Sequence, residues 1–208
     1  RLVGSEMCIR DRGNYAVPSV TFTRGSGTEL FDSEGRRYLD FLCGLAVTSL
    51  GHSHPRIAAA ISDQSGKLLH TSNLFATEPQ LEVARRIDTL VRSGIGQPGR
   101  VLFQNSGAET IEAAVKLARK YHGPGRHGVV SAYRSFHGRT LAALAATGQP
   151  EKHEPFQPLP EGFRLASWND LDAFAAAVDP TVGAILVEPL QGEGGILSLI
   201  HISEPTRR

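Results

Sequence analysis

The sequence predicts an α/β fold built on a mostly parallel sheet. From about residue 100 onward, short apolar runs alternate with segments of helical periodicity, the order typical of strands joined by helices. Residues 183–187 form a continuous apolar run, which is typical of a parallel strand buried on both faces. With 208 residues, of which 40% are hydrophobic, the chain is long enough to bury a sizeable core in one or two domains.

The first half of the chain carries clear signals for individual elements. Alternating apolar residues predict strands, a turn at 32–35 separates two of them, and Pro55 is placed to open a helix. Strands are expected at 20–23, 29–32 and 37–40, and helices at 55–69 and 78–92.

The second half begins with a predicted strand at 101–103. The helix expected at 107–121 repeats its apolar face at Ile111, Ala114, Val115 and Ala118, which is helical spacing. A strand at 128–130, short helices at 140–146 and 170–178, and a strand at 183–187 complete the expected order.

Composition and charge exclude several classes of protein. A net charge of +1 gives no reason to expect nucleic acid or an anionic membrane as partner, and no apolar run approaches the length of a membrane span. Two cysteines make no disulfide framework, so a reduced, cytoplasmic setting is expected, without a signal peptide. Residues 1–12 and 197–208 share no pattern with the interior, and we expect both to be non-native flanks.

The run 105–109 predicts an anion site. It turns through Gly107 into a helix, and helix N-termini present unpaired N–H groups to which phosphates bind. Glycine at this place allows close approach of a phosphate. Ser106 and Glu109 also have the spacing of a capping box, which explains both residues without any ligand.

A second group of residues supplies an aromatic ring, an imidazole and a guanidinium within four positions: Phe136, His137 and Arg139. Beside a phosphate site, they indicate an aromatic phosphate cofactor and an acidic substrate, since arginine binds carboxylates with two donors. Alternatively, the ring belongs to the core, the histidine is structural and the arginine is a solvated surface residue.

Glu188 and Glu193 flank a glycine-rich turn at a strand end, where α/β sheets place ligands. The alternative is an ordinary charged loop. His52 and His54 lack a third ligand of fitting spacing, so we predict structural histidines and no metal site. Residues 25–30 begin like a dinucleotide fingerprint but lack its third glycine and following helix.

Six segments of residues 14–196, in order, resemble the N-terminal half of class III pyridoxal-phosphate-dependent aminotransferases, above all those that act on acetylornithine: 38–47, 51–55, 72–75, 106–109, 136–140 and 187–195. The resemblance implies fold type I, truncated, with an N-terminal segment of the small domain at 13–70 and the first part of the large cofactor-binding domain at 71–196.

The same resemblance implies roles for individual residues. Ser106, Gly107 and Ala108 would bind the phosphate of pyridoxal 5'-phosphate, with the backbone N–H groups of the last two as donors. Phe136 would stack on its ring, with His137 beside it and Glu188 close to the cofactor. Arg139 would bind a substrate carboxylate. Glu193 would pair with an arginine from the C-terminal part of the family's enzymes and help to discriminate between amino donors.

The implied reaction moves an amino group between N-acetylornithine, or a similar ω-amino donor, and 2-oxoglutarate. The resemblance also implies a place in arginine biosynthesis and a homodimeric enzyme. The family's Schiff-base lysine is matched by none of Lys67, Lys116, Lys120 and Lys152. We therefore expect a fragment that has no catalytic residue of its own and is inactive. Alternatives are an ornithine, succinyldiaminopimelate or 4-aminobutyrate aminotransferase, a glutamate-semialdehyde mutase, or a non-catalytic binding module.

Overall fold

The computed structural model describes residues 18–199, and its contacts divide the chain into two compact units, Arg1–Thr89 and Leu90–Arg208. This division lies nineteen residues beyond the boundary expected at 70, and the assignment of 13–70 and 71–196 to two domains remains a prediction. The flank at 1–12 and residues 200–208 of the second flank lie outside the described residues.

The first unit contains a three-stranded antiparallel sheet of β1 (Phe22–Ser26), β2 (Glu29–Asp32) and β3 (Arg37–Leu39), in that order. A strand is found near each of the three predicted places, but the first runs over 22–26 and not over 20–23. Asp32 organises the turn between β2 and β3, since its carboxylate accepts the N–H groups of Glu34 and Arg36 and the Arg36 guanidinium. Burial alone would raise the pKa of Asp32, but these bonds and one from Tyr38 lower it to about 2.

Helices follow this sheet. α2 (Cys43–Ala46) is a single irregular turn, α3 (Pro55–Lys67) begins at its proline as expected, and α4 (Glu78–Ile95) runs three residues beyond the predicted end. In α3 and α4 the apolar faces stay exposed among the described residues, with Ile61 at 64% and Leu81 at 60% of their full exposure. Within residues 18–199 no helix is both long and apolar enough to cross a membrane.

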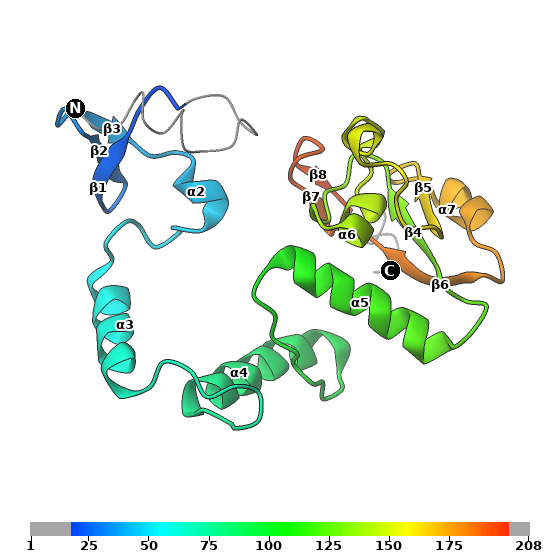
Figure 1. Ribbon diagram of the computed structural model, residues 1–208, viewed down its shortest axis with the longest axis horizontal. Helices are drawn as coiled ribbons and strands as arrows, with labels where there is room; N and C mark the ends of the chain where they lie inside the picture. Colours follow the sequence, from blue (N-terminus) through cyan, green and yellow to red (C-terminus); the bar gives the residue numbers. More distant parts are fainter. Residues whose placement is uncertain (1–17, 200–208) are drawn as a thin grey trace, which may run out of the picture. The chain divides into compact units, whose positions relative to one another are not determined.

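The second unit is built on a parallel sheet, as predicted, in the order β5 (Phe163–Ala166), β4 (Gly128–Ala132) and β6 (Val182–Leu186) (Figure 1). Every residue of the central strand β4 is buried. The core joins Val130, Ala166 and Val182 to the apolar face of α7 (Leu171–Ala177).

Helix α5 (Gly107–His122) packs against β6 and against α6 (Leu141–Ala146). Two short 3-10 helices, η1 (Pro150–Lys152) and η2 (Glu154–Phe156), lead from α6 toward β5. After β6, a small antiparallel pair follows, β7 (Leu190–Gln191) with β8 (Leu197–Ser198).

Two expectations for strands are wrong. Residues 101–103 form no strand, because no neighbouring segment among the described residues pairs with them. The strand at 183–187 starts one residue earlier, and it is not buried on both faces: Ile185 is 54% exposed. β6 is an edge strand of the described sheet, so β4 covers it on one side only.

Candidate functional site

The first turn of α5 has the geometry of a capping box. The Ser106 hydroxyl accepts the N–H of Glu109 at 3.2 Å, and the Glu109 carboxylate turns back to accept the N–H of Asn105 at 2.8 Å. The backbone N–H groups of Gly107 and Ala108 have no acceptor among the described residues. The capping and anion-binding interpretations are therefore compatible, because the box leaves these two donors unused.

Gly107 and Gly138 differ in whether packing requires a glycine. A Cβ added at Gly107 would meet no atom within 4 Å, so packing inside the chain does not demand glycine there. A Cβ at Gly138, whose φ is +133°, would come within 2.9 Å of the Ala108 Cβ. Gly138 therefore lets the loop that follows β4 lie directly on the first turn of α5.

That loop carries the predicted aromatic and basic residues. Phe136 is half-buried, and the guanidinium carbon of Arg139 lies 6.0 Å from its ring centre. His137 is buried, and its backbone N–H donates to the Thr147 hydroxyl at 2.9 Å. Among the described residues its Nε2 atom has no partner. Burial lowers the pKa of His137 to about 4, so the imidazole is neutral at pH 7.

Glu188 joins the loops that leave β4 and β6. It lies two residues beyond the end of β6, and its carboxylate accepts the backbone N–H of Phe136 at 3.3 Å. Burial raises the pKa of Glu188; the bond from Phe136 opposes this rise, and the negative charge of Glu193 adds to it. This carboxylate therefore keeps its proton to a higher pH than an exposed one.

Glu193 follows β7 and has partners that sequence reasoning missed. Its carboxylate accepts the Lys152 ammonium at 2.8 Å and the Gln149 amide at 3.0 Å, and these bonds lower the pKa of Glu193. The Lys152 nitrogen lies 5.4 Å from the ring centre of Phe136. The resemblance implies an arginine as partner of Glu193, whereas the described partner is Lys152. Nothing in the sequence around Lys152 signals a contact across forty-one residues.

The structure thus gathers the predicted residues at the carboxyl edge of the parallel sheet. Phe136, His137 and Arg139 leave β4, Glu188 leaves β6, and Gly138 connects them to the first turn of α5. Parallel sheets place ligands at this edge. The site offers two free N–H donors, a ring face with two cations near it, and a buried neutral imidazole.

His52 and His54 lie outside this group. The His52 ring bonds the Asp40 carboxylate at 2.6 Å, which makes it a structural partner of the segment after β3. No cluster of three metal-binding side chains occurs among residues 18–199. Cys43, the one cysteine in this range, is a free thiol.

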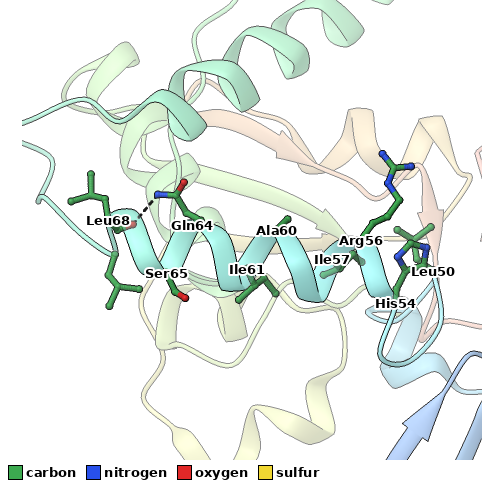
Figure 2. Close-up of a pocket in the computed structure, with 10 residues that line it drawn as sticks. Leu50, His54, Arg56, Ile57, Ala60, Ile61, Gln64, Ser65 and Leu68 are labelled. Carbon is green, nitrogen blue, oxygen red and sulfur yellow. Dashed lines mark hydrogen bonds between the residues drawn. The ribbon is translucent and has the colours of Figure 1, made fainter.

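A separate hollow lies along α3. This groove of about 740 Å³ is lined mainly by apolar side chains, among them Leu50, Ile57, Ile61 and Leu68. Figure 2 shows Ile57 and Ile61 along α3 and Leu50 and Leu68 near its two ends. The hydrogen bond marked there runs from the Gln64 amide to the backbone of Leu68. Among the described residues, its polar lining residues are His54, Arg56, Gln64 and Ser65, with no carboxylate and no phenyl ring beside them, so the groove lacks the chemistry of the carboxyl-edge site.

Comparison with known proteins identifies the family. The family model "Aminotransferase class-III" matches residues 10–201, which include all the residues gathered above. The acetylornithine aminotransferase of Methanothermobacter thermautotrophicus is 44% identical over 183 residues, covering 88% of this chain and 45% of that protein. The one from Caldanaerobacter subterraneus is 49% identical over 181 residues, covering 85% and 45%.

Solved structures agree in fold. Two structures of ornithine aminotransferase from Toxoplasma gondii match with a TM-score of 0.80 at 34% and 33% identity, over 92% of this chain and 46% of theirs. The second is described as having partial occupancy of PLP at its active site. A Bacillus anthracis aminotransferase matches with a TM-score of 0.81 at 26% identity, over 93% and 49%.

The fold predicted from the resemblance, that of the fold type I transaminases, is confirmed by these matches. The chain spans about half the length of the curated relatives it matches. The family model covers residues 10–201, which is most of the sequence. The chain belongs to the class III aminotransferases.

Proposed function

We propose that this chain forms part of a pyridoxal-phosphate-dependent enzyme that moves an amino group between N-acetylornithine and 2-oxoglutarate. The observation that carries the proposal is the contact of Gly138 with Ala108, which sets the aromatic and basic loop beside an unused pair of helix N–H donors. The acetylornithine aminotransferases named above support the choice of amino donor.

The residues present fit pyridoxal phosphate. The N–H groups of Gly107 and Ala108 would hold its phosphate, and the open space at Gly107 leaves room for close approach. Phe136 would stack on its ring, and the unpartnered Nε2 atom of buried His137 offers a polar contact beside it. When bound, the cofactor supplies an electron-withdrawing ring that stabilises negative charge at the reacting carbon.

The chain's own residues would bind and orient the substrates. Arg139 presents a guanidinium near the Phe136 ring, where it would hold the carboxylate of the amino donor and of 2-oxoglutarate. Glu193 lies nearby with a lowered pKa, so it is negatively charged at pH 7 and would repel a misplaced carboxylate. Glu188 would hold the Phe136 loop in place from β6.

The remaining elements of the proposal concern the whole enzyme. None of the four lysines matches the family's lysine for covalent attachment of the cofactor, so we propose that this stretch alone is inactive. A homodimer, arginine biosynthesis and a cytoplasmic setting remain part of the proposal, the last supported by a sequence with only two cysteines. The competing donors are ornithine, succinyldiaminopimelate and 4-aminobutyrate. Ornithine has the support of the similar Toxoplasma ornithine aminotransferases.

The test is a donor comparison in a full-length protein carrying these residues. We expect kcat/KM to be highest for N-acetylornithine with 2-oxoglutarate as acceptor, against ornithine, succinyldiaminopimelate and 4-aminobutyrate at equal concentration. A higher kcat/KM for one of the other three would change the proposed amino donor but leave the proposed reaction, amino transfer, in place. Absence of transfer from all four, in protein that binds pyridoxal phosphate, would reject the function.

A further inference from the structure

Glu112 makes an unusual set of bonds between two helices. It lies in the second turn of α5 and is half-buried. One of its carboxylate oxygens, Oε1, accepts the Thr140 hydroxyl at 2.6 Å and the backbone N–H groups of Ala142 at 3.1 Å and Ala143 at 3.3 Å. All three donors belong to the start of α6, so a side chain of α5 caps a different helix.

α6 depends on this outside acceptor. Thr140 is its N-cap residue, yet its hydroxyl makes no cap bond to the helix and donates to Glu112 instead. The first N–H groups of a helix have no partner within the helix and need one elsewhere. Glu112 supplies the acceptor that Thr140 does not.

The same bonds fix the position of Arg139. Gly138, on one side of it, packs against Ala108 in the first turn of α5, and Thr140, on the other side, is bonded to Glu112 in the second turn. The backbone of Arg139 is therefore attached to α5 both before and after it. α5 also carries the N–H donors of Gly107 and Ala108, so one rigid helix sets the spacing between those donors and the guanidinium.

We infer that Glu112 is a positioning residue for substrate binding: it holds Arg139 at a fixed place relative to the first turn of α5. This inference rests on the proposed function, in which the first turn of α5 binds phosphate and Arg139 binds a carboxylate. The neighbouring Glu109 differs, because it caps its own helix. The Ser-x-x-Glu pattern predicts the capping role of Glu109 from the sequence, whereas the bonds of Glu112 to α6 are visible only in the folded chain.

The experiment uses full-length protein loaded with pyridoxal phosphate and measures the dissociation constant of glutarate, an unreactive five-carbon dicarboxylate, together with KM and kcat for 2-oxoglutarate. Glu112→Ala should weaken glutarate binding on the order of 10- to 100-fold, with cofactor absorbance unchanged. Glu112→Gln should stay within about threefold of the wild type, since an amide oxygen accepts the same bonds.

A matched control separates positioning from general destabilisation. Asp170 caps α7 by accepting the N–H of Ala173 at 2.9 Å, a bond that lies at the start of α7. Asp170→Ala should lower the melting temperature without changing the glutarate affinity. If Glu112→Ala folds poorly, Glu112→Asp replaces it, because the shorter side chain withdraws the oxygen and keeps the charge.

The double variant Glu112→Ala/Arg139→Ala decides the mechanism. If Glu112 acts through Arg139, glutarate binds the double variant as it binds Arg139→Ala alone, whereas independent effects would multiply. The inference would be overturned if the losses of glutarate affinity multiply in the double variant. It would also be overturned if Glu112→Gln loses as much affinity as Glu112→Ala, or if Glu112→Ala lowers the melting temperature and leaves the glutarate affinity unchanged. Glutarate binding needs no turnover, so a protein that depends on Glu112 for glutarate but transfers no amino group would reject only the proposed function.

Discussion

At the scale of single residues, Arg139 is the side chain on which substrate binding would depend most. Its guanidinium lies near the Phe136 ring, and arginine binds a carboxylate through two parallel bonds. Truncating one member of such a pair costs roughly 2–5 kcal/mol when the pair is shielded from water, or about thirty- to several-thousand-fold in affinity.

We therefore expect Arg139→Ala, in the full-length enzyme, to raise KM steeply for both the amino donor and 2-oxoglutarate. Cofactor absorbance should stay unchanged, because the N–H donors proposed for the phosphate belong to Gly107 and Ala108. Steady-state kinetics with each substrate varied in turn would check this. Unchanged KM values for both substrates would remove Arg139 from the site.

His137 gives a prediction for pH dependence. Its pKa is lowered by burial to about 4, below the value of about 6.5 for an unfolded histidine. Between these pH values His137 is protonated in the unfolded chain but not in the folded chain. The free energy of unfolding should therefore fall as the pH drops from about 6.5 toward 4. The NMR titration of this imidazole should show a midpoint near 4, and His137→Gln should flatten the loss of stability over that range. A midpoint above 6 would contradict the buried, neutral state.

At the scale of elements, the two glycines that meet at α5 allow a paired prediction. Gly107→Ala adds a methyl group that meets no atom of the chain, so the melting temperature should be maintained while affinity for pyridoxal phosphate drops. Gly138→Ala places a Cβ within 2.9 Å of Ala108 on a backbone with φ of +133°, so it should lower the melting temperature markedly. Thermal melts with and without cofactor would separate the two. The reverse ranking would show that Gly107, and not Gly138, is required by the fold.

The same scale shows how far a sequence can be interpreted alone. Local signals predicted the α5 capping box and the start of α3, because Ser106 with Glu109 and Pro55 act within one helical turn. The strand predicted at 101–103 was wrong, because a strand needs a neighbouring strand to pair with. These residues are apolar but have no such neighbour among the described residues. The contacts of Lys152 with Glu193 and of Glu112 with α6 join distant segments, and no local pattern encodes them.

At the scale of the whole molecule, the described chain exposes many large apolar side chains. Leu69 is 83% exposed, Leu117 66% and Ile185 54%, and Ile185 lies on an edge strand. In contrast, Val115 on the predicted apolar face of α5 is buried, so part of that face is already covered. Exposed apolar area and open strand edges favour association between molecules.

We therefore expect the isolated 208-residue chain to aggregate or to bind a hydrophobic dye strongly. Dye fluorescence and light scattering during a thermal scan would measure this, with a full-length class III aminotransferase as control. A soluble monomer with a sharp cooperative melt and little dye binding would show that the chain is self-sufficient, and would revive the binding-module alternative.

The complete burial of β4 has a consequence for local opening. Its backbone is bonded to a strand on each side, whereas β6 has a described neighbour on one side only. Amide hydrogens exchange with solvent through local and global opening, and those in core strands exchange last. The amides of Val129 to Ala132 should therefore be the slowest in the second unit. The loop that carries Phe136 and Arg139 leaves this strand, so the start of that loop is anchored to the most protected part of the sheet.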